Sequence, residues 1–196
     1  MRISLHTLEE RKYSTLSRKR KKFYNELFYH VVSRGVRREA IFINHSDFSA
    51  FLYILNQTYD QFSYELPSYC LMNNHYHLLI RIKSHSLAEF MHCLNKRYAS
   101  YFNNKYGYSG RVFDHNYFSS AIYTYESLLK VSKYIHLNPL RAHLVKDLVD
   151  YPWSSYSFYK SGNVYPPTFI PIAHLLDTFN GTINEQRRSY CDFVEE

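Results

Sequence analysis

The segment YCLMNNHYHLLIRI, residues 69–82, decides the fold because it contains two apolar runs that meet at a turn. The runs, which extend over 63–72 and 75–83, have the composition of β-strands. Asn73 and Asn74 separate them and favour a tight turn, since asparagine tolerates positive φ. The segment therefore predicts a β-hairpin.

The second strand of this hairpin carries two histidines one residue apart. Alternate side chains of a strand point to the same face, so His75 and His77 project together while Tyr76 points the other way. Two imidazoles on one strand can chelate a divalent metal ion. A catalytic metal needs a third ligand, and no acidic residue flanks the pair.

The remainder of the chain alternates strand and helix patterns around the hairpin. This order, β-α-β-β-α-β-α, predicts an α+β fold with a ferredoxin-like antiparallel sheet and helices packed on one face. In chain order we expect a strand over 25–33, a helix from Ser46 or Asp47, the hairpin, a helix that begins at Ser86 with Glu89 as its capping-box partner and stops at Gly107, a strand over 111–123, a helix over 124–137 ended by Pro139, and short helical pieces over 171–180 and 184–194.

Composition bounds the class of protein. With 196 residues, 45% of them hydrophobic, the chain can bury the core of one domain. We expect a basic flexible arm over 1–24, a main domain over 25–160 and a helical extension packed on it over 161–196. The net charge of +7, with the block SRKRKK at 17–22, favours a polyanionic partner.

Cysteine usage and hydropathy indicate a cytoplasmic protein. The three cysteines, Cys70, Cys93 and Cys191, lie far apart, which argues against a disulfide scaffold and against a cysteine zinc site. The first residues lack the apolar stretch of a signal peptide, and no run approaches the length of a membrane span.

The third predicted helix supplies a polar stripe that is unusual for a core-facing helix. Tyr134 and Asn138 are four residues apart, so they share one face, and Lys130 and Arg141 continue it. Asn138 precedes Pro139, and residues before proline are pushed from helical geometry, which leaves the aim of Asn138 open. The expected core stripe is Leu128, Leu129, Ser132 and Ile135.

Together with the HxH strand, the segment YIHLNPLRAHLV resembles the single-tyrosine HUH transposases, and most of all the REP-associated tyrosine transposases among the IS200-like enzymes. The segments FYHVVSRGVRREAIF, LMNNHYHLLI, GRVFDHNYF and YPWSSY also resemble that family, and their order agrees with it over roughly 28–160. The chain departs from the family pattern at Asn73, where proline is usual, at Tyr76, where an aliphatic residue is usual, and at His143, where glycine is common.

The resemblance implies an activity and a site. His75, His77 and Asn138 would hold a divalent ion, Mg²⁺ or Mn²⁺, and Tyr134 would attack single-stranded DNA bearing a hairpin to form a 5′-phosphotyrosine bond. Lys130, Lys133 or Arg141 would favour the phenolate. A monomer is favoured, although a homodimer stays open. The residues expected to contact DNA are Arg34, Arg37, Arg38, Lys96, Arg97, Lys130 and Arg141.

Two alternatives remain open. One is a non-catalytic protein that binds DNA hairpins, and the other is an unrelated basic RNA-binding α+β domain, which leaves the histidine pair and YIHLNP unexplained. Two further histidines are interpreted as structural, His30 as a strand residue beneath the site and His136 as a core residue of the third helix.

Overall fold

The predicted hairpin forms the centre of the fold. The computed structural model describes residues 23–114 and 116–196, so the predicted arm over 1–24, apart from its last two residues, lies outside the described residues. Strands β2 (Tyr64–Met72) and β3 (His75–Ile82) pair antiparallel, and Cys70 lies opposite His77. The turn forms as predicted, but neither asparagine needs positive φ.

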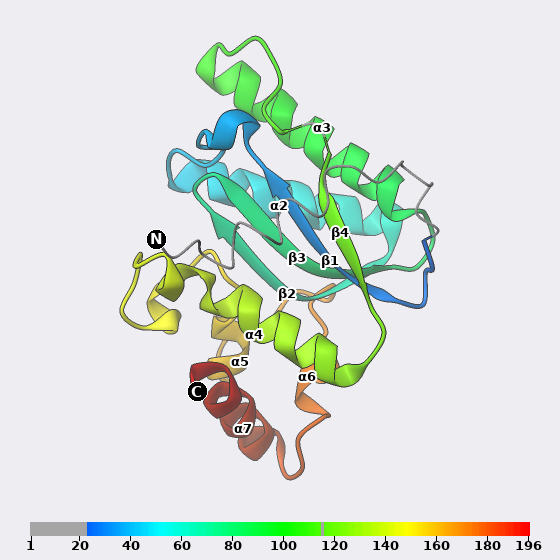
Figure 1. Ribbon diagram of the computed structural model, residues 1–196, viewed down its shortest axis with the longest axis vertical. Helices are drawn as coiled ribbons and strands as arrows, with labels where there is room; N and C mark the ends of the chain where they lie inside the picture. Colours follow the sequence, from blue (N-terminus) through cyan, green and yellow to red (C-terminus); the bar gives the residue numbers. More distant parts are fainter. Residues whose placement is uncertain (1–22, 115) are drawn as a thin grey trace, which may run out of the picture.

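Two further strands complete a four-stranded antiparallel sheet (Figure 1). Strand β1 (Phe28–Arg34) pairs with β3, and β4 (Phe118–Ile122) pairs with the other edge of β1, which gives the order β2-β3-β1-β4. This is the ferredoxin-like order, so the predicted α+β class and sheet are confirmed. The last strand is shorter than the predicted 111–123, since Phe113 makes only an isolated bridge to Gly35.

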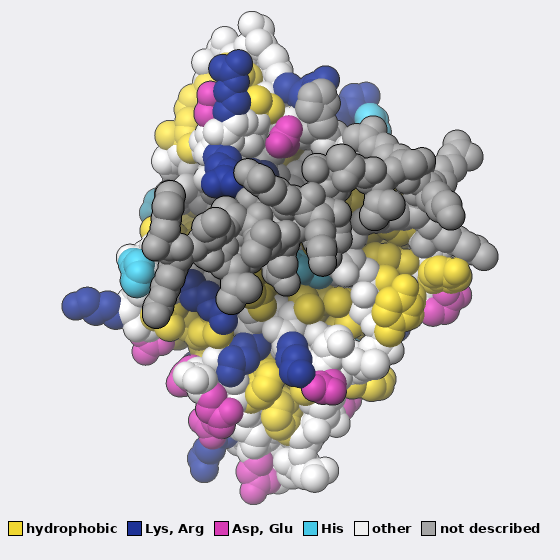
Figure 2. Space-filling view, in the orientation of Figure 1, with side chains coloured by type: hydrophobic (Ala, Val, Ile, Leu, Met, Phe, Trp, Pro, Cys, Tyr) yellow, Lys and Arg dark blue, Asp and Glu magenta, His cyan; other side chains and the backbone are white. Residues whose placement is uncertain are grey.

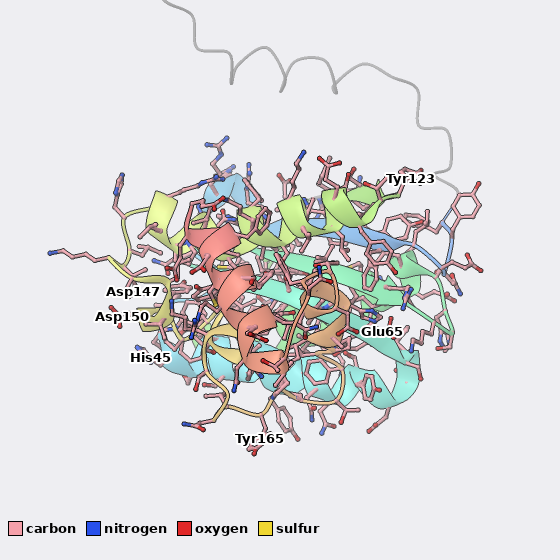
Figure 3. All side chains as sticks on the ribbon, turned by 90° about the horizontal axis from the view of Figure 1, so that it is seen from below. His45, Glu65, Tyr123, Asp147, Asp150 and Tyr165 are labelled. Carbon is pink, nitrogen blue, oxygen red and sulfur yellow. The ribbon has the colours of Figure 1, made fainter. Side chains whose placement is uncertain are left out.

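Helices cover both faces of the sheet, whereas one face was predicted. Figure 3 shows α4 and α2 on opposite sides of it. β3 is buried on both sides, with Leu78 and Ile80 in the core beneath α2 and α3 and Leu79 in the core beneath α4, so both faces need apolar cover. The helices are α2 (His45–Phe62), α3 (Leu87–Tyr106), α4 (Tyr125–Arg141), α5 (Ser157–Lys160), α6 (Ala173–Leu176) and α7 (Ile183–Glu195), with 3₁₀ turns η1 (Val36–Arg38) and η2 (Leu148–Asp150).

The starts of the long helices follow from local hydrogen bonds. The α3 helix begins and ends as predicted, with a capping box between Ser86 and Glu89 and a left-handed Gly107 after its last turn. The predicted start of α2 at Ser46 or Asp47 is one or two residues late, because Asn44 is the N-cap and the Asp47 carboxylate accepts from the Asn44 backbone N–H. None of the helices in the described part of the chain is long and apolar enough to cross a membrane.

A buried polar layer joins α4 to the sheet and to the C-terminal helix. His136 is fully buried, and its Nε2 and Nδ1 lie 2.9 Å from Ser155 Oγ and 3.0 Å from Tyr190 Oη. The Tyr190 hydroxyl also hydrogen-bonds Ser132, which in turn bonds Ser68 of β2. Because each buried polar group has a partner, the layer holds α4 at one position along the sheet.

The buried His136 predicts a loss of stability in mild acid. Complete burial lowers its pKa to about 3, so below pH 6.5 the unfolded chain binds a proton that the folded chain excludes. The stability that comes from keeping His136 neutral is therefore fully present above pH 6.5 and is lost as the pH falls from 6.5 towards 3. The expected cost is about 1.4 kcal/mol per pH unit in the free energy of unfolding, measured by urea denaturation between pH 7 and 5.

A matched variant isolates this contribution from that of the other histidines. His136→Gln keeps a polar group beside Ser155 but has no proton to take up in this range. It should lower the free energy of unfolding at pH 7. It should also reduce the number of protons taken up on unfolding between pH 7 and 5 by about one, which makes the free energy of unfolding less dependent on pH. An unchanged pH dependence would contradict the assignment.

Candidate active site

The predicted nucleophile and one predicted metal ligand lie against each other. His77 is almost fully buried on the face of β3 that α4 covers, whereas Tyr134, on α4, is 41% exposed. Their ring centroids are 5.6 Å apart, with the rings nearly perpendicular. His75 lies beside His77 on the same face, at a centroid distance of 4.9 Å. Tyr76 points to the opposite core, as alternation predicts.

In each histidine of the pair one ring nitrogen is occupied. His75 Nδ1 lies 2.7 Å from Oδ1 of Asn74, and His77 Nδ1 lies 3.0 Å from Nε2 of His30. Nε2 of His77 is buried with no hydrogen-bond partner among the described residues. An unpartnered buried polar atom costs free energy, and a metal ion at Nε2 would remove that cost. The pair therefore fits a metal through its Nε2 atoms.

The surroundings keep the three imidazoles neutral. Burial lowers the pKa of His30 to about 4, and burial together with the nearby Arg34 lowers the pKa of His75 to about 4. Burial and the neighbouring histidines hold the pKa of His77 well below its usual value. Neutral imidazole is the form that binds metal, so His75 and His77 can coordinate an ion at neutral pH.

Asn138 is held by its own helix. Pro139 was predicted to end α4, and this prediction is wrong. The proline lies inside the helix, which continues to Arg141. Because Pro139 has no N–H, the carbonyl of Ile135 lacks its usual helical donor. Nδ2 of Asn138 lies 3.4 Å from that oxygen and donates to the carbonyl of Tyr134 at 2.8 Å. The amide nitrogen is thus anchored, which leaves Oδ1 as the atom able to bind a metal.

The direction of α4 brings Asn138 towards His75. Ser132 hydrogen-bonds Ser68 of β2, and Ser68 is paired with Leu79 of β3. About half a helical turn later, the Tyr134 ring packs on His77, which is nearer the start of β3. Asn138 is one turn further along the helix, towards the end of β3 that begins with His75. No group of three or more His, Cys, Asp or Glu residues in 23–114 and 116–196 is arranged to hold a metal.

Of the cations on α4, one faces Tyr134, the predicted nucleophile. The Arg141 guanidinium lies over the Tyr134 ring, 5.4 Å from its centroid. Lys130 instead pairs with Glu126, and Lys133 donates to the backbone carbonyl of Phe193 on α7. Arg141 is therefore the α4 cation in contact with the Tyr134 ring.

The predicted DNA-contacting residues lie in three places, one of which is α4 with Lys130 and Arg141. Arg34 lies opposite His75 in the β1–β3 register, and the exposed Arg37 and Arg38 follow in η1. Lys96 and Arg97 are exposed on α3, which covers the other face of the sheet. On the face shown in Figure 2, Lys and Arg side chains lie in separate groups among hydrophobic and acidic ones.

The loop with Arg37 and Arg38 has a strained backbone. Both residues have positive φ, 54° and 64°, which is unfavourable for side chains other than glycine. Asn74 Nδ2 donates to the Arg38 carbonyl, and its own carbonyl accepts from Gly35 N–H. A Cβ at Gly35 would lie 2.2 Å from the Glu39 carbonyl oxygen, so only glycine fits. The loop is thereby fastened to the turn that precedes His75.

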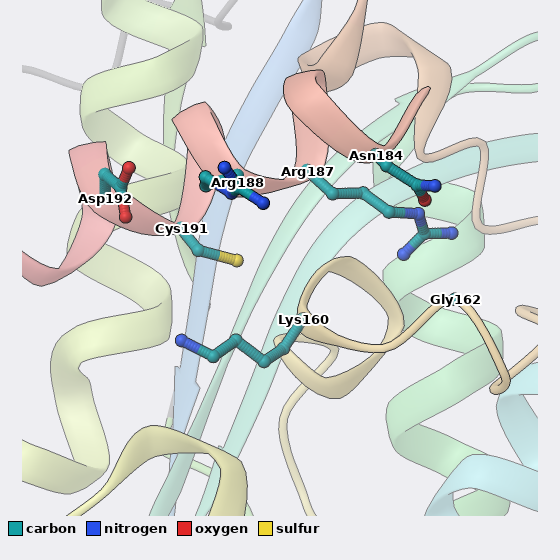
Figure 4. Close-up of a pocket in the computed structure, with 7 residues that line it drawn as sticks. All are labelled: Lys160, Gly162, Asn184, Arg187, Arg188, Cys191 and Asp192. Atoms are coloured by element: carbon teal, nitrogen blue, oxygen red, sulfur yellow. The ribbon is translucent and has the colours of Figure 1, made fainter. Parts of the chain in front are cut away.

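A separate hollow between α5 and α7 does not belong to this site (Figure 4). It has a volume of about 270 Å³ and is lined by Lys160, Arg187 and Cys191 among others. Arg187 donates to three backbone carbonyls at 158, 159 and 161, and Lys160 pairs with Glu195. These cations join the C-terminal extension to the domain.

Two residues that touch the histidine pair were not predicted. His30 was interpreted as a strand residue beneath the site, and Asn74 only as part of a turn. The signal that identifies them is the pairing of β1 with β3, which puts His30 diagonal to His77 across the sheet. Nothing local in the sequence specifies this pairing.

Comparison with known proteins assigns the family. The features above define an α+β protein of ferredoxin-like topology whose site pairs two strand histidines with a helix tyrosine. A family model described as "Transposase IS200 like" matches residues 23–138. The chain belongs to the IS200-like transposase family.

Two solved structures are similar to this chain, and the first of them agrees with its fold. One is a REP-associated tyrosine transposase bound to a REP hairpin, with a TM-score of 0.62 and 16% identity over 77% of this chain and 89% of that chain. Another is a candidate transposase from Deinococcus radiodurans R1, with a TM-score of 0.43 and 18% identity over 61% of this chain and 95% of that chain. A search of curated proteins gave no match.

The anchoring of Asn138 leads to a test at Pro139. Pro139→Ala adds an N–H that can donate to the Ile135 carbonyl, so the Asn138 amide loses one of its two partners. We expect faster exchange and broader NMR signals for the Asn138 side-chain NH₂, and weaker Mn²⁺ binding. Leu140→Ala, one residue further along and exposed, should change neither. An unaltered Asn138 amide in Pro139→Ala would contradict the anchoring role.

Proposed function

We propose that the protein nicks and rejoins hairpin-bearing single-stranded DNA through a covalent bond to Tyr134, as a transposase of the REP-associated branch. The observation that carries this proposal is the Tyr134 ring packed on His77, whose Nε2 is buried and has no hydrogen-bond partner within the described part of the chain. Membership of the IS200-like transposase family supports it. The relative of similar fold that was solved with a REP hairpin supports a hairpin as the ligand.

The donor set favours a divalent metal ion held by His75, His77 and Asn138. Two neutral imidazoles and an amide oxygen add no negative charge, so a bound Mg²⁺ or Mn²⁺ keeps its full charge for phosphate oxygens and water. When bound, such an ion polarises the phosphate and stabilises the charge that develops in the transition state.

The chain's own residues account for the transfer. Water can accept the phenol proton of Tyr134 because the side chain is 41% exposed, and the Arg141 guanidinium lies over the ring. The phenolate oxygen attacks phosphorus, an O–P bond to Tyr134 forms, and the P–O3′ bond breaks. The 3′ oxygen takes up a proton and leaves as a hydroxyl. Attack by another 3′-hydroxyl reverses these steps, rejoins the strand and frees Tyr134.

One chain supplies every residue in this proposal. Tyr134 contacts His77 of its own sheet, and the polar layer around His136 holds α4 there. This supports a protein that acts as a monomer. Its proposed compartment is the cytoplasm, which rests on the cysteine usage of the sequence.

Covalent chemistry at Tyr134 is tested by trapping the adduct. Incubated with a single-stranded hairpin and Mn²⁺, the protein should give a denaturation-resistant protein–DNA adduct on a gel. Tyr134→Phe should abolish the adduct, because it removes the attacking oxygen, while hairpin affinity stays within about threefold in a gel-shift assay.

The matched control for this variant is Tyr125→Phe, a change to an exposed tyrosine in the first turn of the same helix, which should leave the adduct intact. An adduct that persists in Tyr134→Phe would contradict the nucleophile assignment. A wild-type protein that binds the hairpin tightly and never forms an adduct would favour the non-catalytic hairpin binder.

The arginines beside the histidines should bind the DNA backbone. Replacing Arg37 and Arg38 by asparagine removes two charges and suits their positive φ. We expect roughly tenfold weaker hairpin binding at 0.15 M salt. The slope of the logarithm of the binding constant against the logarithm of the salt concentration should fall in magnitude by about one to two, because fewer counterions are released.

The matched pair for this test is Lys96→Gln with Arg97→Gln on the other face of the sheet. A larger loss from this pair than from Arg37 and Arg38 would place the DNA over α3 and contradict the proposed path.

A further inference from the structure

His30 occupies the position from which His77 can be oriented. It lies on β1, on the sheet face that α4 covers, and its ring stacks on that of His77 with an angle of 18° and a centroid distance of 5.3 Å. Nε2 of His30 and Nδ1 of His77 are 3.0 Å apart, which is hydrogen-bond distance. The two residues are 47 positions apart in sequence and meet only through the β1–β3 pairing.

A hydrogen bond between two neutral imidazoles fixes both tautomers. One nitrogen must donate and the other must accept. If His77 Nδ1 carries the proton, its Nε2 holds a free lone pair, and Nε2 is the buried atom without a partner. If the proton is on His30 Nε2 instead, His77 carries its proton on Nε2, buried and without an acceptor. The first arrangement avoids a buried N–H that has no acceptor.

His30 is not itself placed as a ligand. Its Nε2 is used by His77, and the described histidines do not form a three-residue metal group. Its ring also packs edge-on against Tyr134 and Phe118, at centroid distances of 5.8 and 6.3 Å. These contacts immobilise the His30 ring, so its acceptor stays aimed at His77. A histidine ligand whose other nitrogen is so bound is oriented and made more basic.

We propose that His30 is a positioning residue that holds His77 in the Nδ1–H tautomer, with the Nε2 lone pair directed to the metal site. This inference rests on the proposed function for its purpose. Its geometric content, the tautomer of His77, can be measured without metal or DNA.

The test uses two variants that separate the acceptor from the ring. His30→Phe keeps an aromatic ring against Tyr134 and Phe118 but has no acceptor, and His30→Gln can place an amide oxygen near the position of Nε2. The first readout is the tautomer of His77 in the metal-free protein, from ¹⁵N-histidine NMR at pH 7.5. Wild type and His30→Gln should show the Nδ1–H form, whereas His30→Phe should show a substantial Nε2–H population.

The second readout is Mn²⁺ affinity, measured by electron paramagnetic resonance without DNA. His30→Phe should weaken binding by 10- to 100-fold, and His30→Gln should restore it to within a fewfold of wild type. His77→Ala sets the level of binding without the site, and melting temperatures measured in EDTA confirm that the variants fold.

Each outcome bears on one proposal. An Nδ1–H tautomer that persists in His30→Phe, or an Nε2–H tautomer in the wild type, would overturn the role of His30. Equal Mn²⁺ affinity in the wild type, His30→Phe and His30→Gln would also overturn the role of His30, provided that His77→Ala abolishes binding. If the tautomer of His77 differs between the wild type and His30→Phe as expected, but the wild type binds no Mn²⁺, the metal part of the proposed function fails. The orientation of His77 by His30 then still stands.

Discussion

The site depends on the burial of β3 between two neighbouring strands and two helical layers. A strand with partners on both edges and apolar cover on both faces cannot shift its register without exposing a complete row of side chains. That constraint fixes His75 and His77 towards α4 and Tyr76 towards α2 and α3. A side chain on such a strand has a nearly fixed position, and a metal site requires ligands that are held in this way.

The second half of the site is positioned by polar rather than apolar contacts. Leu128 and Ile135 pack α4 on the sheet, but similar apolar contacts would form if the helix slid along its axis. The hydrogen bonds from Ser132 and His136 have fixed partners, so they specify where along the sheet the helix lies. Tyr134 and Asn138 project from the opposite side of the same turns, and their positions follow from that register.

Local patterns predicted the elements and most of the candidate site, because the signals were local. The hairpin and the α3 caps each depend on a few adjacent residues, and their predicted positions are confirmed. The cover on the second face and the contact of His30 with His77 were not predicted, since both depend on which distant segments pack together. The α4 terminus was predicted wrongly because Pro139 was treated only as a helix breaker, while Asn138 can supply the donor that proline lacks.

The polar layer under α4 also bears on where the folding unit ends. The family model stops at residue 138, yet the partners of His136 include Ser155 and Tyr190, which lie beyond it. The part of the chain that identifies the family is therefore smaller than the part that surrounds its buried polar groups. A domain boundary drawn at residue 138 would cut through a hydrogen-bond network that extends into α7.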